Sequence, residues 1–236
     1  MIGKIKQKVI SLLYFGWRYH CPICGGNFRD WRMCGMVRRR RGKCPQCNCV
    51  ERHRLIYLYL KNKTRFFQDA LKVLHVAPEA CFHKRFAALP NLSYTTADLD
   101  SPLAHILLDV TDMKKISDKT YDVVLCSHVL EHVSDDRKAM REICRILKPG
   151  GWAILQVPIF EGNTFEDPAI VTAEERIKHY GQEDHRRRYG LDYKDRLAAA
   201  GFDVSVDTYV KTLGKKAVEK YGLDNSEDIY LCTKKS

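Results

Sequence analysis

Two pairs of cysteines near the amino terminus have the spacing of a zinc site. Cys21 and Cys24 form one CxxC unit, Cys44 and Cys47 form a second, and 19 residues separate the two units. This spacing is typical of structural sites in which four thiolates hold one Zn²⁺ ion tetrahedrally. We therefore expect these four residues to bind a structural zinc ion, although a small change of register would let Cys49 replace Cys47.

Polar residues follow several short apolar segments between residues 70 and 135. They stand at His75–Ala80, Asp98–Asp100, Asp109–Asp112 and Ser127–His132, each directly after a predicted strand. A parallel α/β sheet binds its ligand beyond the carboxyl ends of its strands. These groups are therefore the candidates for a binding or catalytic site, although Glu131 and His132 are expected to support the helix that follows them.

The polar segment of residues 159–190 holds further candidates. Its motif YGQEDHRRRYG places Asp184 beside His185, followed by Arg186, Arg187 and Arg188. A carboxylate can orient an imidazole as a general base, and arginine forks bind phosphates and carboxylates. The segment is predicted to be a cap that holds an anionic substrate, although a surface loop with a local Asp–His pair would give the same pattern.

The predicted elements follow the order of an α/β domain. Strands alternate with helices from residue 71 onward, which indicates a parallel sheet covered on both faces. The predicted strands are Val73–Ala77, Ser93–Ala97, Ile106–Leu108, Val123–Cys126, Trp152–Val157, Phe202–Val210 and Ile229–Thr233. The clearest helix begins with Ser134 as its N-cap and ends at the KPGG turn of residues 148–151.

This order of motifs resembles the class I S-adenosylmethionine (SAM) dependent methyltransferases, and the type 11 methyltransferase group in particular. An acid follows the second and third strands, VLEH follows the fourth, and KPGG precedes the fifth. The resemblance covers about residues 70–235. It implies a Rossmann-like sheet of seven strands with a reversed last strand, and SAM as the methyl donor.

Matching positions imply a set of cofactor-binding residues. Besides the first loop, these are Asp98, Leu99, Asp109, Val110, Ser127 and His128. Asp98 would accept the ribose hydroxyls, with Asp100 as its competitor, and Asp109 would receive the adenine amino group. Ser127 and His128 would line the methionine end of SAM, where His128 is a candidate general base together with the Asp–His pair of the cap.

The loop after the first strand departs from the family pattern. The family has an acid and a glycine-rich turn there, which lets backbone amides approach the cofactor, whereas this chain has LHVAPEA over residues 74–80. Two interpretations stay open. Either His75 takes the place of the acid while Glu79 pairs with the SAM ammonium group, or the domain has lost SAM binding and serves in a non-catalytic, zinc-dependent adaptor.

Positive charge is concentrated at the amino-terminal end of the 236-residue chain. The formal net charge is +11, and residues 1–70 hold 16 lysines and arginines against 3 acidic residues. Residues 1–20 are predicted to form a basic amphipathic helix that binds an anionic membrane or docks on the rest of the protein. Arg38–Arg41, between the CxxC units, would suit phosphate groups.

The sequence thus predicts four parts. They are the helix at 1–20, a four-cysteine zinc ribbon at 21–49, a linking helix within 50–70 and a methyltransferase domain at 71–236 with its cap at about 159–190. The apolar stretch Val9–Trp17 is far shorter than the ~20 residues of a membrane span and lacks a cleavage site. We therefore expect a cytoplasmic protein, which residues 1–20 could bring to the inner membrane face.

Two anionic acceptors fit these features. We favour methyl transfer to a glycan or lipid-linked saccharide intermediate, because the helix is compatible with membranes and type 11 relatives are often assigned to surface polysaccharide pathways. RNA is the alternative, since a cysteine-zinc module ahead of a SAM domain also resembles certain ribosomal RNA guanine methyltransferases. Against RNA, Phe28 and Trp31 are the only aromatic residues near the basic run that could stack on bases.

Overall fold

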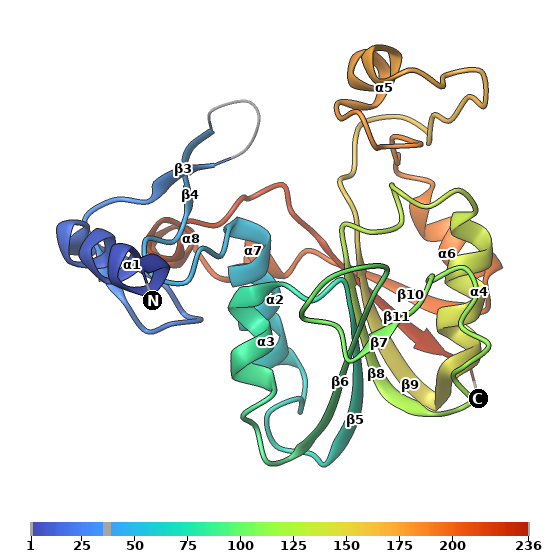
Figure 1. Cartoon of the computed structure of the whole chain (residues 1–236), viewed down its shortest axis with the longest axis horizontal. Helices are drawn as coiled ribbons and strands as arrows, with labels where there is room; N and C mark the ends of the chain where they lie inside the picture. The colour runs from blue at the N-terminus through green and yellow to red at the C-terminus, as the bar shows by residue number, and fades with distance from the viewer. Residues whose placement is uncertain (1, 35–38, 236) are drawn as a thin grey trace. The chain divides into compact units, whose positions relative to one another are not determined.

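The computed structural model describes residues 2–34 and 39–235, with side chains for 7–34 and 42–235 (Figure 1). The chain divides into two compact units. The first unit comprises the residues up to Asp69 together with Glu79–Leu89 and Thr208–Asp228, and the second comprises Ala70–Pro78, Pro90–Asp207 and the residues from Ile229 onward. This division differs from the predicted boundary at residue 71, because two later segments belong to the first unit.

The first unit consists of helices and two short antiparallel strand pairs. Its helices are α1 (Ile2–Leu13), α2 (Glu51–Lys63), α3 (Ala80–Phe86), α7 (Tyr209–Thr212) and α8 (Lys215–Tyr221). Its strands are β1 (Phe15–His20), which pairs with β2 (Asn27–Phe28), and β3 (Arg32–Cys34), which pairs with β4 (Arg39–Lys43). The helix predicted within residues 50–70 is α2.

The amino-terminal helix is shorter than predicted. It ends at Leu13, and residues 15–20 form β1, in which Tyr19 pairs with Phe28 and His20 with Asn27. Aromatic residues favour strands and glycine weakens a helix, so the sequence FGWRYH suits β1 better than a continued helix. The prediction of one helix over residues 1–20 is therefore wrong beyond Leu13.

A buried arginine joins the segments of the first unit. Arg54 of α2 is fully buried, and its guanidinium donates hydrogen bonds to the carbonyls of Gly42, Cys49, Tyr221 and Gly222 over 2.6–3.3 Å. A buried charge is tolerated where such partners satisfy its donors. Arg54 thus fastens the loop that carries the second CxxC unit to the end of α8.

One sheet of seven strands forms the centre of the second unit (Figure 1). Its strands are β5 (Leu71–Val76), β6 (Leu92–Asp98), β7 (Ile106–Leu107), β8 (Tyr121–Ser127), β9 (Leu147–Gln156), β10 (Phe202–Asp207) and β11 (Ile229–Lys234), in the order β10-β11-β9-β8-β5-β6-β7. Strands β5 to β9 run parallel, whereas β11 is antiparallel to both β9 and β10. The predicted α/β fold with a reversed last strand is confirmed.

Two helices of the second unit, α4 (Asp136–Ile146) and α6 (Tyr193–Ala199), contact each other and the sheet at the right of Figure 1. The N-cap of α4 is Asp135, one residue after the predicted Ser134, and its side chain accepts a hydrogen bond from the Lys138 amide. The predicted cap contains a helix, α5 (Ala173–Tyr180), that begins with a Thr172–Glu175 capping box. Among the described residues, no helix is long and apolar enough to cross a membrane.

Candidate functional site

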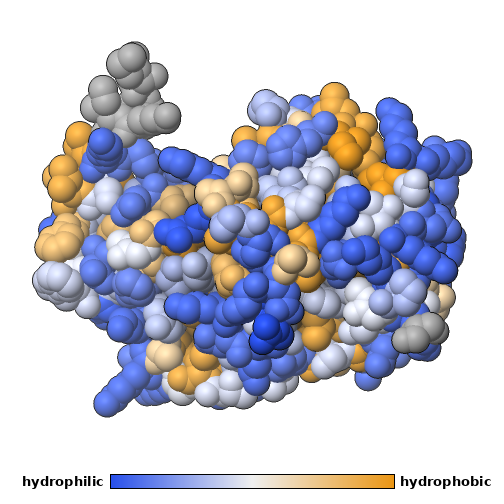
Figure 2. Space-filling model, turned by 90° about the horizontal axis from the view of Figure 1, so that it is seen from below, coloured by the Kyte–Doolittle hydropathy of each residue, from blue (hydrophilic) through white to orange (hydrophobic). Residues whose placement is uncertain are grey.

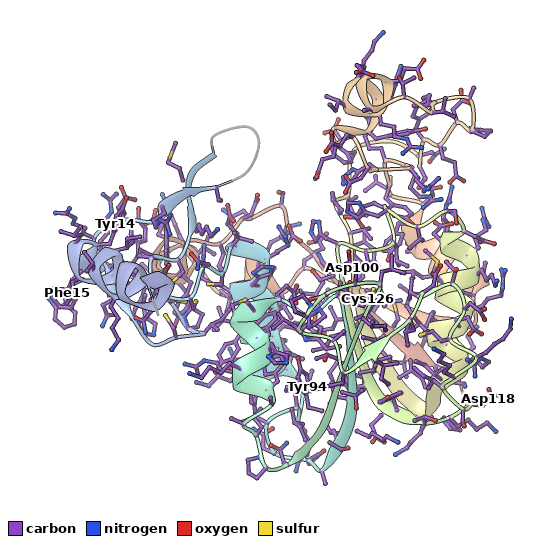
Figure 3. All side chains as sticks on the ribbon, in the orientation of Figure 1. Tyr14, Phe15, Tyr94, Asp100, Asp118 and Cys126 are labelled. Atoms are coloured by element: carbon purple, nitrogen blue, oxygen red, sulfur yellow. The ribbon has the colours of Figure 1, made fainter. Side chains whose placement is uncertain are left out.

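The register of the sheet brings three predicted site positions to one edge. Val76 pairs with Ala97 on β6 and with Cys126 on β8, so the next residue of each strand lies where these parallel strands end. Those next residues are Ala77, Asp98 and Ser127. Figure 3 shows Asp100 toward this edge and Asp118, which precedes β8, toward the opposite one.

The acids at the end of β6 and after β7 are each held by the turn that they begin. Asp98 is half-buried, and its Oδ1 accepts hydrogen bonds from the amides of Asp100 and Ser101, both at 3.2 Å. Asp109 is exposed, and its Oδ1 accepts from the Thr111 amide at 2.7 Å. These turns use Oδ1 and fix each carboxylate, so Oδ2 of Asp98 can accept a hydroxyl of a ligand.

Two other predicted cofactor positions differ in burial. Leu99 is 68% exposed, and Val110 is buried in the core of the second unit. The side chain of Val110 is therefore committed to packing, and only its backbone could contact adenine. Whether Asp98 or Asp100 holds the ribose stays a prediction.

Ser127 and His128 form a strained, polar end to β8. The Ser127 Oγ is buried and has no hydrogen-bond partner within the described part of the chain. His128 has a φ of 57°, and its Nδ1 lies 3.1 Å from Glu131 Oε1. Left-handed residues and unpaired buried hydroxyls are kept where a ligand needs them, so this strand end suits the polar methionine part of SAM.

The loop after β5 keeps a left-handed turn without glycine. Ala77 has a φ of 50°, and its amide donates to the Ala97 carbonyl at 2.8 Å. A residue with a Cβ atom pays about 1–2 kcal/mol for this conformation. The backbone therefore follows a path that glycine would adopt without strain.

The two polar side chains predicted around this loop have partners within the protein. His75 is buried, and its Nδ1 lies 2.7 Å from the Tyr94 hydroxyl. Glu79 belongs to the first unit, where its Oε1 lies 3.5 Å from His53 Nε2. A contact of either His75 or Glu79 with SAM stays a prediction.

In the cap, Asp184 orients a different histidine from the one predicted. Its Oδ2 lies 3.0 Å from His132 Nδ1, whereas His185 Nδ1 lies 3.2 Å from the Tyr180 carbonyl. His185 is buried, and this burial lowers its pKa. The predicted Asp184–His185 pair is thus corrected to an Asp184–His132 pair, because the cap folds back onto the segment that follows β8.

The three cap arginines divide into one buried and two exposed side chains. Arg187 is buried and donates to three carbonyls of residues 130–134 at 2.7–3.0 Å and to Glu166 Oε2 at 2.9 Å. Four of its five N–H donors are thus used within the protein, so a substrate contact of Arg187 has little support and stays a prediction. Arg186 and Arg188 are exposed and stay candidates for an anionic group.

A cavity of about 280 Å³ beside the cap is lined by an arginine that the sequence analysis did not identify as a site residue. Arg176 of α5 lines it together with Arg186, and the Arg176 Nε is buried with no hydrogen-bond partner among the described residues. The apolar part of the wall includes Pro168 and Ile170. A single arginine in a charged helix gives no sequence signal, so only the folded cap reveals this position.

The four predicted zinc ligands converge in the first unit. Their Sγ atoms lie within 4.8 Å of one another, and the distances from Cys21 to Cys47 and from Cys24 to Cys44 are both 3.7 Å. A tetrahedron with Zn–S bonds of about 2.3 Å has sulfurs about 3.8 Å apart. The amides of Gln46 and Cys47 also face Cys44 Sγ at 3.4 and 3.5 Å, so these thiols fit a zinc ion.

Cys49 is a fifth thiol beside this cluster. It is fully buried, and its Sγ lies 3.4 Å from Cys21 Sγ and 3.7 Å from Arg54 Nη1. A guanidinium contact suits a thiolate that lies outside the metal shell. The alternative register with Cys49 in place of Cys47 stays open, and Arg38–Arg41 lie outside the described side chains.

Part of the chain is similar to known methyltransferases. Residues 82–155 match the family model described as "Methyltransferase domain". The thiol S-methyltransferase TMT1B of Rattus norvegicus is 48% identical over 40 residues, which are 17% of this chain and 16% of that protein. The ubiquinone biosynthesis O-methyltransferase of Hydrogenovibrio crunogenus is 31% identical over 55 residues, 23% of each. The chain thus spans less than a quarter of the length of either relative.

Solved structures share the fold at low identity. A SAM dependent methyltransferase from Archaeoglobus fulgidus has a TM-score of 0.50 and 16% identity, over 76% of this chain and 93% of that one. The [4+2]-cyclase SpnF has a TM-score of 0.52 and 16% identity, over 99% and 95%. The chain therefore shares the fold of these structures, and its residues 82–155 are similar to a methyltransferase domain. Because a cyclase shares this fold, the reaction has to be argued from the site.

Proposed function

We propose that the protein transfers a methyl group from SAM to an anionic acceptor. The observation that carries the proposal is that Asp98 and Ser127 lie at the same edge of the sheet, on the two strands that flank β5. The Asp98 carboxylate is fixed by its turn, and the Ser127 hydroxyl is buried without a hydrogen-bond partner among the described residues. The match of residues 82–155 to the methyltransferase family supports the same reaction.

The residues at this edge would bind and orient the two reactants. SAM supplies a methyl group on a positively charged sulfur, so transfer depends mainly on alignment and exclusion of water. Asp98 would accept the ribose hydroxyls, Asp109 and the Val110 amide would bind adenine, and Ser127 would bind the methionine part. For a hydroxyl acceptor, His128 would take up the proton.

Calorimetric titration with SAM and S-adenosylhomocysteine tests this proposal. Asp98→Asn keeps an oxygen for the turn but loses the carboxylate charge, and a hydrogen bond to a charged group contributes about 1.5–3 kcal/mol. SAM should therefore bind about 10- to 100-fold more weakly. Asp118→Asn, at the opposite edge of the sheet, should bind like the wild type. Wild-type protein that binds neither ligand would favour the adaptor.

We infer that the acceptor is a lipid-linked saccharide or glycan with an acidic group. In the second unit, Arg176 and Arg186 line the same cavity, and guanidinium groups suit phosphate or carboxylate oxygens. Glu166 and Asp167 line it too, but Glu166 is already paired with Arg187 and Arg196. Transfer of labelled methyl groups from SAM into a cell extract tests the acceptor. Label that partitions with lipid-linked glycans supports it, whereas label removed by ribonuclease would identify RNA as the acceptor instead.

An exposed apolar surface on the first unit supports an acceptor at a membrane. Its residues are 49–80% exposed and comprise Val9, Leu12, Leu13, Phe15 and Trp17. Figure 2 shows hydrophobic residues gathered at the left, and Figure 3 shows the Phe15 ring pointing away from the ribbon. Phe15 and Trp17 lie on one face of β1, with ring centroids 5.3 Å apart. With Lys8 exposed on α1, this surface suits an anionic lipid layer.

Co-sedimentation with phospholipid vesicles tests this peripheral contact. Each buried aromatic side chain contributes about 1.5–3 kcal/mol, so the double variant Phe15→Gln/Trp17→Gln should bind anionic vesicles at least about tenfold more weakly. Met33→Gln, which changes an exposed apolar residue of β3, should bind like the wild type. Equal binding of all three proteins would contradict the membrane contact.

The cysteine cluster completes the proposal with one structural zinc ion. Cys21, Cys24, Cys44 and Cys47 would hold it and stabilise the first unit, with no part in methyl transfer. None of the ten cysteines forms a disulfide, and a reducing compartment preserves such unpaired cysteines. This supports our proposal that the protein is cytoplasmic.

A further inference from the structure

A buried carboxylate stands without hydrogen bonds next to the proposed SAM site. Glu131 is 1% exposed, and neither of its oxygens accepts a hydrogen bond within the described part of the chain. His128 Nδ1 lies 3.1 Å from Oε1, within ion-pair distance, and Oε2 has no hydrogen-bond partner in this part of the chain. Buried carboxylates are costly unless they are paired or coordinate a metal ion. A cation beside Oε2 would complete the pairing of Glu131.

Two histidines near Glu131 have the tautomer of metal ligands. His185 Nδ1 lies 3.2 Å from the Tyr180 carbonyl, which can only accept, so Nδ1 carries the proton and Nε2 keeps a lone pair. His132 Nδ1 faces the Asp184 carboxylate at 3.0 Å and is protonated for the same reason. Metal-binding histidines are usually oriented in this way, by a carbonyl or a carboxylate on the far nitrogen.

The lone pair on the His185 Nε2 has no partner among the described residues. This nitrogen is also buried. An unpaired imidazole nitrogen in the interior costs about 1–3 kcal/mol, and an unpaired carboxylate oxygen costs more. Both groups would be satisfied at once by a single ion between them.

The three side chains converge although they come from two distant segments. Glu131, His132 and His185 each offer one ligand atom, and these atoms lie within 4.8 Å of one another. The Arg186 amide donates to the Glu131 carbonyl at 2.8 Å, and Arg187 bonds to carbonyls of residues 130–134. These bonds fasten the cap to the segment after β8, so the ligand set is built into the fold.

We propose that Glu131, His132 and His185 bind a divalent transition-metal ion, separate from the four-cysteine site. Two imidazoles and one carboxylate are a ligand set for Zn²⁺ and Fe²⁺, and three protein ligands leave coordination positions open. Those positions would take oxygen atoms of the acceptor, a phosphate or a hydroxyl. This last step rests on the proposed function, whereas binding of the ion does not.

Zinc content tests the site on the full chain. Protein equilibrated with Zn²⁺ and freed of unbound metal should hold two zinc ions per chain. His132→Gln and His185→Gln should each hold one, and His179→Gln, a matched change in α5, should hold two. His132 has a side chain that is 32% exposed, so its variant tests the site even if the change at buried His185 prevents folding. Wild-type protein with one ion, or a folded His132→Gln variant with two, would overturn the proposal.

X-ray absorption identifies the ligands of each ion. The wild type should show sulfur at about 2.3 Å together with nitrogen and oxygen at about 2.0–2.1 Å, and the one-zinc variants should show sulfur alone. Two ions that are both bound only by sulfur would also overturn the proposal. SAM titration separates this result from the proposed function: two ions without SAM binding would reject methyl transfer only, and SAM binding with one ion would reject the metal site only.

Discussion

Arg187→Ala should destabilise the second unit strongly. The Arg187 side chain is 4% exposed, and its loss leaves three carbonyls of residues 130–134 without their donor. Removing one partner of a buried ion pair costs about 3–5 kcal/mol. Arg196 still pairs with Asp136 and Glu166, at 3.2 and 2.9 Å, so we expect the lower end of this range. At about 2–4 °C per kcal/mol, about 3 kcal/mol lowers Tm by about 6–12 °C.

Thermal unfolding followed by circular dichroism measures this loss. Arg188→Ala is the matched control, because Arg188 is exposed and its guanidinium lies 5.0 Å from the centroid of the Phe160 ring. An exposed cation–π contact contributes about 0.5–1 kcal/mol, so this control should shift Tm by at most a few degrees. If both variants unfold at the same temperature and only Arg187→Ala loses acceptor binding, Arg187 would be a substrate ligand and the structural argument would fail.

Three further predictions test other parts of the molecule. Ala77→Gly should relieve about 1–2 kcal/mol of left-handed strain and lose about 0.4–1 kcal/mol to the freer unfolded chain, so Tm should rise slightly; a fall would contradict the strained turn. Cys44→Ser should remove the sulfur-bound zinc and lower the stability of the first unit, whereas Cys34→Ser should keep the metal, as zinc analysis will show. Although burial raises the pKa of Glu166, Arg196 and Arg187 hold it below the ordinary value. The ionised Glu166 carboxylate therefore stabilises the folded protein above about pH 4.3, and this contribution is lost as the pH falls through the lowered pKa. Acid unfolding of Glu166→Gln should be less steep than that of wild type, with exposed Glu174→Gln as the unchanged control.

The sheet could be predicted from the sequence because its strands alternate with helices. All seven predicted strands are present, and parallel register alone then brings the last residues of β6 and β8 to one edge. Side-chain partners could not be predicted in the same way, because they depend on how the cap folds back. Asp184 is next to His185 in the sequence, yet it contacts His132, 52 positions earlier along the chain.

The three arginines show a second limit of sequence reasoning. Residues 185 to 189 alternate between buried and exposed, as an extended segment does. With arginine at three consecutive positions, the sequence does not indicate which of them faces inward. The bridge between Phe165 and Arg188 fixes that choice, and it forms only once the cap is folded.

The same inward arginine connects the stability of the cap to the proposed metal site. Arg187 bonds to the carbonyls of residues 130–134, the segment that carries Glu131 and His132, while His185 lies two residues before it. Arg187→Ala should therefore loosen two of the three ligands without touching any of them. Below its Tm, this variant should keep the sulfur-bound zinc ion and lose the second one, and Arg188→Ala should keep both. Retention of two ions by folded Arg187→Ala would mean that the ligands hold their positions independently of the buried network.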